Sequence, residues 1–246
     1  MIKTLLSIFL IAFFPIFSCN YLDRESSLLD RITGEKGVAS GSFVEQTFSR
    51  SDIRGLSGIE GDLYSGRRWN DANGENIVVF SWFYTSQDKE INTSKSKIGD
   101  TLHLRVYHFL RSKNAHWQMI CCVEDHEVCD RDWSLYGGFI PESIAVTDLD
   151  DNNIGEVSFV YIKACVTGIS PFRMKAMMLE DSVKYIAEGT TIIDYGYGEV
   201  AGKKEVTYNS ALKETHQEFR SHFNQVWDTW CVHSEKYSEG HYRHKF

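Results

Sequence analysis

The stretch from Asp148 to Glu156 concentrates side chains that can bind a metal ion through oxygen. Asp148, Asp150 and Asn152 stand at alternate positions, and the alternation continues through the backbone carbonyl of Ile154 to Glu156. Ca²⁺ binds roughly six to eight oxygens, and a curled loop can supply them from alternate positions. We therefore predict one structural calcium ion held by these residues. The alternative is an acidic β-turn without an ion, because Asp and Asn also build turns unaided.

The spacing of this loop excludes an EF-hand, which needs a carboxylate at its twelfth position, where this chain has Phe159. The loop resembles instead the short strand–loop–strand calcium sites of FG-GAP and VCBS-type extracellular modules. Those sites usually carry glycine at the sixth position, where Asn153 stands, and asparagine can adopt the same left-handed conformation. A second loop, Asp71 to Glu75, fits the alternation less well, and we interpret it as a turn.

Sequence motifs that would indicate an enzyme are few. The stretch "GLSGIEG" (55–61) lacks the spacing of a nucleophile elbow, and "GYGEVAGKKE" (196–205) lacks the spacing of a phosphate-binding loop. A glycoside hydrolase needs two carboxylates several ångströms apart. Glu60, Asp62, Asp132 and Glu156 are all candidates for such a pair, and nothing in the sequence selects two of them. We therefore favour a binding function over catalysis.

The elements that must position these residues are mostly strands. The run "NIVVFSWFY" (76–84) is typical of a buried strand, and "TLHLRVYHFL" (101–110) alternates apolar and polar residues, as a half-exposed strand does. Similar short runs, separated by turn residues, continue to about residue 194. Their spacing favours an antiparallel meander over alternating strands and helices.

One amphipathic helix is predicted near the C-terminus, over residues 211–232. Its apolar stripe recurs at spacings of three and four and consists of Leu212, His216, Phe219, Phe223, Val226 and Trp230. Such a helix should lie across a sheet and close its core. The predicted fold class is therefore mainly β (α+β), with one or more antiparallel meander sheets covered by a C-terminal amphipathic helix.

The N-terminus has the pattern of an export signal. Lys3 precedes an apolar run, Leu5 to Phe17, that is shorter than the ~20 residues needed to span a bilayer. The sequence "IFSC" resembles a lipobox, so we predict a signal peptide over 1–18 and lipidation of Cys19, with plain secretion as the alternative. A polar tether over 19–46, a single β-rich domain with its helix over 47–232 and a flexible tail over 233–246 complete the predicted organisation.

The charge balance limits the classes of partner. The formal net charge of −8 argues against nucleic acid and against docking on anionic lipid through a basic patch. A membrane would instead be reached through the lipid on Cys19. The remaining cysteines, five in number, suit an oxidising compartment, and their odd count leaves at least one outside an intramolecular disulfide.

Several segments together resemble one family of Gram-negative cell-envelope proteins, labelled surface polysaccharide biosynthesis proteins. The segments are "WNDANGENIVV" (69–79), "LRVYHF" (104–109), "DLDDNNIGEVSFVY" (148–161) and "ACVTGISPFRMK" (164–175), and the likeness covers Trp69 to Ile193. In that pattern two cysteines recur together, and they fall on Cys129 and Cys165. The resemblance therefore implies a disulfide between these two residues.

The resemblance also implies a process and a compartment. We expect an outer-membrane lipoprotein, facing the periplasm or the cell surface, that acts in surface polysaccharide assembly or display through binding. Its partners would be the membrane, through the lipid, and a glycan or an envelope protein. The alternatives are an enzyme that cleaves glycans with a carboxylate pair and a purely structural or adhesive surface module.

Overall fold

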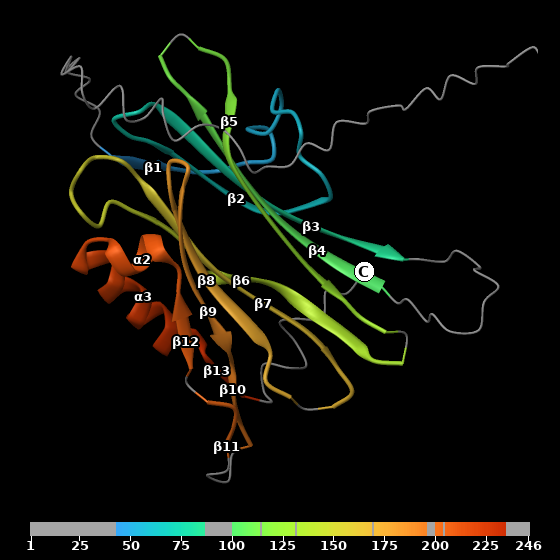
Figure 1. The fold of residues 1–246 in the computed structure, drawn as a ribbon. Helices are drawn as coiled ribbons and strands as arrows, with labels where there is room; N and C mark the ends of the chain where they lie inside the picture. The colour runs from blue at the N-terminus through green and yellow to red at the C-terminus, as the bar shows by residue number, and fades with distance from the viewer. Residues whose placement is uncertain are drawn as a thin grey trace, which may run out of the picture. The chain divides into compact units, whose positions relative to one another are not determined.

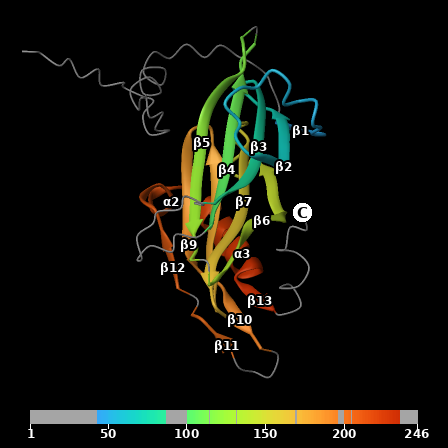
Figure 2. The same cartoon turned by 90° about the vertical axis from the view of Figure 1, so that its right-hand side faces the viewer.

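The computed structural model describes residues 43–86, 100–113, 115–130, 132–168, 170–195, 200–203 and 205–234. The predicted signal peptide, Cys19, most of the tether and most of the tail lie outside these residues. The described residues form antiparallel sheets with two helices near the C-terminus, which confirms the predicted mainly β fold class. Figures 1 and 2 show the sheets in two views.

The first sheet is an antiparallel meander whose strands lie side by side in sequence order. Its strands are β1 (Val44–Gln46), β2 (Asp62–Asn70), β3 (Glu75–Ser86), β4 (Asp100–Arg111) and β5 (Gln118–Val128). Leu102, Leu104 and Val106, whose alternation predicts a strand, lie in β4 and are all buried. The three residues of β1 belong to the predicted tether, but they pair with the end of β2 and so form part of the sheet. The folded part therefore begins before residue 47, earlier than predicted.

The second sheet is also antiparallel, with the strand order β12-β9-β8-β7-β6. Its strands are β6 (Ser134–Thr147), β7 (Glu156–Val166), β8 (Arg173–Glu180), β9 (Val183–Thr190) and β12 (Val206–Tyr208). A small third sheet contains β10 (Ile192–Asp194), β11 (Val200–Ala201) and β13 (Val232–Ser234). β13 pairs in parallel with β10, so the ordered chain continues past residue 233, where the tail was predicted to begin.

Side chains from both sheets share one hydrophobic core between them. Phe80 of β3 packs edge-to-face against Phe139 of β6 and Phe159 of β7, with ring centroids 5.2 and 5.1 Å apart. Edge-to-face pairs of this kind are favourable beyond the area that they bury. Because alternate residues of a strand point to opposite faces, the outward half of each strand needs a separate cover. Cys121 and Cys122 illustrate this, since they are buried on opposite faces of β5.

Helices α2 (Ser210–Glu214) and α3 (Gln217–Trp230) cover the outer face of the second sheet, as Figure 1 shows. The sequence predicts one continuous helix, but the chain is extended at Thr215 and begins a new helix after His216. Within α3 the buried face also differs from the predicted stripe. Trp227 is fully buried, whereas Trp230 is only partly buried at the edge of the same cluster.

The segment before β2 covers part of the outer face of the first sheet. Phe48, Ile53, Leu56 and Ile59 pack against a cluster that includes Tyr107. The end of this segment is fixed by two hydrogen bonds: the Glu60 amide donates to the Tyr107 hydroxyl at 3.1 Å, and the Ser81 hydroxyl donates to the Glu60 carbonyl at 2.6 Å. The outer face of the second sheet is therefore covered by helices, and that of the first sheet is covered in part by this segment.

Candidate metal centre

Three connections between strands meet at one end of the two sheets. They are the β2–β3 turn (71–74), the β6–β7 loop (148–155) and the β8–β9 turn (181–182). The Ala72 amide donates to the Asn153 carbonyl at 2.8 Å, and the Asn73 side chain donates to the Asp181 carboxylate at 2.9 and 3.0 Å. The predicted calcium loop is therefore tied to the β2–β3 turn, and that turn is tied in the same way to the β8–β9 turn.

The β6–β7 loop is curled by hydrogen bonds from its own backbone to its acidic and amide side chains. Asp148 accepts from the Asn153 amide at 3.1 Å, and Asn152 accepts from the Ile154 amide at 2.6 Å. Asp151 and Asn153 have φ values of 55° and 63°, in the left-handed region. Asn153 thus takes the conformation that glycine usually supplies at this position, as the sequence predicts.

Three of the predicted ligands converge in this loop. One carboxylate oxygen from each of Asp148, Asp150 and Glu156 lies within 4.8 Å of the other two. Glu156 is completely buried: one of its oxygens accepts from the Leu149 amide at 3.0 Å and from the Thr147 hydroxyl at 3.1 Å. Its other oxygen and one oxygen of Asp148 are buried without a hydrogen-bond partner. Among the described residues, no lysine or arginine forms an ion pair with these three carboxylates.

The three carboxylates repel one another, and the surroundings of Glu156 disfavour its charged form. Burial, together with the nearby Asp150 and Glu180 carboxylates, raises the pKa of Glu156 to about 7, although two hydrogen bonds oppose the shift. A buried acceptor without a donor costs about 1–3 kcal/mol, and more when the group is charged. A divalent ion bound by oxygen would remove both the unsatisfied acceptors and the mutual repulsion.

Asn152 and Ile154, the other two predicted ligands, take part in the loop through different atoms. The Asn152 amide nitrogen donates to Asp150 at 3.1 Å and to Glu180 at 2.8 Å, so it lies between two carboxylates. Its oxygen is occupied by the Ile154 amide. The roles of the Asn152 oxygen and the Ile154 carbonyl as ligands therefore stay predictions.

Glu180 is a residue of this site that the sequence analysis missed. It lies directly opposite Glu156 in the β7–β8 register, and its carboxylate also accepts from the Tyr185 hydroxyl at 3.1 Å. Burial and the Glu180 charge raise the pKa of that tyrosine to about 12. Glu180 reaches the loop through the pairing of β7 with β8, and no local sequence motif around Glu180 indicates this position.

The second acidic loop is a turn, as interpreted from the sequence. Asp71 is 6% exposed, and its carboxylate accepts from the Trp69 ring nitrogen at 2.9 Å and from the Gly155 amide at 3.1 Å. It also accepts from the amides of Asn73 and Gly74 at 2.9 and 3.2 Å. With four N–H donors on one carboxylate, Asp71 fixes the β6–β7 loop to the β2–β3 turn.

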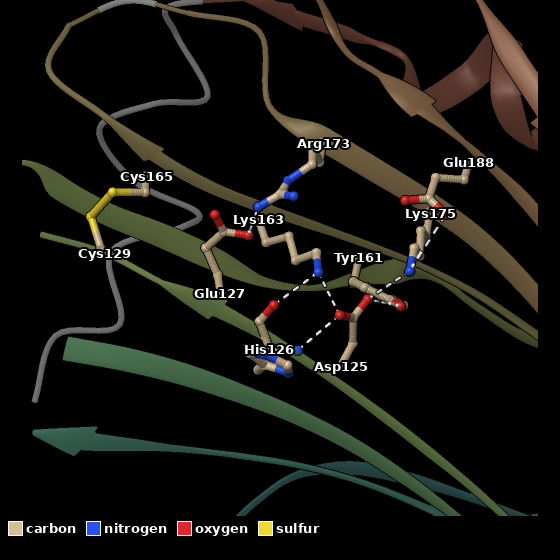
Figure 3. Close-up of polar contacts among 10 residues, drawn as sticks. All are labelled: Asp125, His126, Glu127, Cys129, Tyr161, Lys163, Cys165, Arg173, Lys175 and Glu188. Atoms are coloured by element: carbon tan, nitrogen blue, oxygen red, sulfur yellow. Dashed lines mark hydrogen bonds and ion pairs between the residues drawn. A yellow bond between two sulfur atoms is a disulfide. The ribbon is translucent and has the colours of Figure 1, made fainter. Parts of the chain in front are cut away.

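A polar seam joins the two sheets at a distance from this loop (Figure 3). Asp125 of β5 accepts from the Tyr161 hydroxyl at 2.7 Å, from Lys175 at 2.9 Å and from Lys163. Burial alone would raise the pKa of Asp125, but the hydrogen bonds from Lys163, Tyr161 and Lys175 outweigh it and lower the pKa to about 2.

The polar seam continues along β5 and onto strands β8 and β9 of the second sheet. Glu127, two residues after Asp125, pairs with Arg173, and Lys175 also pairs with Glu188 at 3.5 Å. Cys129 and Cys165 form the disulfide that the resemblance implies, with Cα atoms 5.1 Å apart. Each charge in the seam has a partner of opposite sign, so we interpret it as a structural link between the sheets.

Two of the candidate carboxylates for glycan cleavage, Glu60 and Glu156, lie in different parts of the fold. Glu60 pairs with Arg105 at 3.6 Å beside the outer face of the first sheet, whereas Glu156 lies in the loop at the end of the second.

No helix of the described residues is long and apolar enough to cross a membrane. Comparison with models of protein families, with curated proteins and with solved structures finds no match.

Proposed function

We propose that this chain is an exported, non-catalytic envelope module that holds one structural Ca²⁺ in the β6–β7 loop. The observation that carries the proposal is the convergence of Asp148, Asp150 and Glu156 within 4.8 Å, with a fully buried Glu156 oxygen that has no partner. The Asn152 oxygen, the Ile154 carbonyl and water would complete the set of ligands.

Calcium suits this set of donors better than the other common divalent ions. Every candidate ligand is an oxygen, which disfavours zinc and copper, since these ions prefer nitrogen and sulfur. Mg²⁺ demands near-ideal octahedral geometry and keeps several waters, whereas Ca²⁺ accepts irregular loops. The ion would be structural, because the loop surrounds it and hydrogen bonds tie the loop to the β2–β3 turn and to Glu180 at the end of β8.

The cellular role is proposed from the N-terminal sequence, the disulfide and the resemblance together. A signal peptide over 1–18 and a lipid on Cys19 would place the chain at the bacterial outer membrane, and the Cys129–Cys165 disulfide suits that oxidising location. The segments between Trp69 and Ile193 suggest surface polysaccharide as the process that it serves. Its partners would then be the membrane, through the lipid, and a glycan or an envelope protein.

Calorimetric titration of the metal-free chain with Ca²⁺ tests the proposal. We expect one site per chain, and we expect Glu156→Gln to weaken it at least about tenfold, because a charged ligand is lost. Glu142→Gln is the matched control, since Glu142 is exposed on the strand that leads into the loop. A wild-type chain that binds no calcium at millimolar concentration would show that the loop is only an acidic turn.

The link to surface polysaccharide needs a separate measurement. Cells that lack this chain should display less surface polysaccharide, and the wild-type chain should restore it. If the amount of polysaccharide on the surface is unchanged by the deletion, the envelope role fails while the calcium site stands.

A further inference from the structure

Two histidines face each other across neighbouring strands of the first sheet, far from the acidic loop in the strand register. His103 of β4 and His126 of β5 are direct partners in the antiparallel pairing, and their ring centroids are 6.3 Å apart. His126 is exposed and His103 is partly buried, so the pair is open to solvent. We propose that this pair is a second metal site, which takes a divalent transition ion such as Zn²⁺.

The separation of the rings is close to what one ion requires. Imidazole nitrogen binds zinc at about 2.0–2.1 Å, so two rings on one tetrahedral ion have centroids about 5 Å apart. The observed distance therefore needs a closure of about 1 Å, which a small rotation of the exposed His126 side chain can supply. Calcium does not compete for this pair, because it prefers oxygen.

The ring of His103 is already oriented by its neighbours on β3. Its Nε2 lies 2.9 Å from the Thr85 hydroxyl, and the ring stacks on Phe83 with centroids 4.4 Å apart and planes 8° apart. With the proton on Nε2 donated to Thr85, the Nδ1 lone pair is left for a metal ion. Outer partners of this kind fix the tautomer and orientation of histidines that bind metals.

Glu124 offers a third ligand on the same face. It precedes His126 by two residues, so both side chains project from one side of β5. Glu124 now pairs with Arg105, but Arg105 also lies 3.6 Å from the Glu60 carboxylate. The guanidinium therefore keeps a partner of opposite charge when Glu124 turns to an ion. Two imidazoles, one carboxylate and a water would make a four-coordinate site.

Calorimetric titration with Zn²⁺, on the full chain with calcium present, tests this site. All variants carry His241→Ala and His244→Ala, so that the two histidines near the C-terminus contribute nothing. We expect His103→Ala and His126→Ala each to weaken zinc binding at least about tenfold. His116→Ala is the matched control, because His116 is exposed and outside the pair, and it should bind like the parent.

Two further variants distinguish ligands from their surroundings. Thr85→Val keeps both imidazoles but removes the partner of His103, and we expect about a tenfold loss of zinc affinity. Asp148→Ala should leave zinc binding unchanged, which separates this site from the calcium loop. Circular dichroism confirms that each variant is folded. Equal zinc affinity in the parent and in His126→Ala, or no zinc binding by the parent at millimolar concentration, overturns the proposal.

Discussion

The hydrogen bonding of Glu156 is the strongest indication of how the β6–β7 loop could bind an ion. One of its oxygens has two donors and the other has none, although the side chain is fully buried. An acid that only shapes a turn would have its acceptors filled by N–H groups, as Asp71 does. The two acids in adjoining segments therefore differ: the Asp71 carboxylate is satisfied within its turn, whereas one Glu156 oxygen has no hydrogen-bond partner.

The first prediction concerns Glu156→Gln in the presence of a chelator. At about pH 8, above the raised pKa of about 7, the wild-type carboxylate is mostly charged and buried without a cation. Gln keeps an oxygen for the Leu149 and Thr147 donors but removes the charge. We expect the variant to be at least as stable as the wild type in chelator, by urea unfolding.

Calcium should reverse this order of stability. At a free concentration a hundred times its Kd, the ion adds about 2.7 kcal/mol to the wild type by mass action. The Gln variant should gain little from the same addition, while Glu142→Gln should respond like the wild type. If Gln is strongly destabilising in chelator and calcium changes neither protein, Glu156 is a purely structural acid.

The second prediction concerns His108, which is buried with Nε2 2.9 Å from the Asn76 side-chain oxygen and Nδ1 3.1 Å from the Asp181 carbonyl. Burial lowers its pKa from 6.5 to about 4, with the Asp181 carbonyl and the Asp71 charge opposing the shift only in part. Between about pH 4 and pH 6.5, His108 is therefore protonated in the unfolded chain but neutral in the folded chain. The contribution of neutral His108 to the free energy of unfolding should be complete above about pH 6.5. It should be lost towards pH 4, which lowers the free energy of unfolding by on the order of 3 kcal/mol.

His108→Gln should remove this share of the pH dependence. Urea unfolding of both proteins in chelator, at a series of pH values from 7 to 4, gives the two slopes. The variant will be less stable throughout, since ring packing is lost, so the slope and not the absolute stability is the test. Parallel curves for the two proteins would show that His108 does not titrate as its burial indicates.

At the scale of elements, the sequence predicted the strands better than the helix. The period-two alternation in β4 and the apolar run in β3 are local signals, and both strands form where they were expected. The break at Thr215 and His216 was missed, because the apolar spacing continues across it. The start of α2 was equally hidden, because Asn209, the residue that caps it, is fixed by hydrogen bonds to strand β9.

The third prediction is that Asn209→Ala destabilises the protein by about 2–3 kcal/mol. The Asn209 oxygen caps α2 by accepting from the Leu212 amide at 3.0 Å, and it accepts from the Ile186 amide at 3.1 Å. Its nitrogen donates to the Lys184 carbonyl at 2.7 Å. The loss of a cap costs about 1 kcal/mol, and each further unsatisfied partner adds a similar amount.

Urea unfolding of Asn209→Ala beside Ser210→Ala measures this effect, because Ser210 is exposed and lies one position further along. We expect Ser210→Ala to cost under about 0.5 kcal/mol, as surface substitutions usually do. Similar losses for both variants would mean that Asn209 does not join α2 to the sheet.

At the scale of the whole molecule, the sequence predicted the loop that holds the candidate site but not what surrounds it. Asp148, Asp150 and Glu156 could be picked out because their spacing is local. The contributions of Glu180 and Asp71 depend on strand pairing and on contact between loops, which no spacing reveals. The polar seam was missed for the same reason, since each of its charges finds its partner on the other sheet.

The polar seam lies at one end of the core that the two sheets share. Inward positions of β5 change from Val123 to Asp125 and Glu127, and Cys129 follows directly after the strand. β7 changes in step to Lys163 and Cys165. Paired buried charges add little net stability, because desolvation offsets their attraction. The disulfide that follows them should therefore carry most of the stabilisation at this end.

The last prediction is that Cys129→Ser with Cys165→Ser lowers the free energy of unfolding by about 4 kcal/mol. The chain-entropy model gives this value for a bond that links residues 36 positions apart, since the cross-link restricts the unfolded chain. Reducing agent should destabilise the wild type by a similar amount and leave the double variant unchanged. The hydrophobic core that the two sheets share remains in the double variant, so both proteins should keep the same circular dichroism spectrum. Alkylation of both cysteines in the native, unreduced protein would show instead that the bond is not formed.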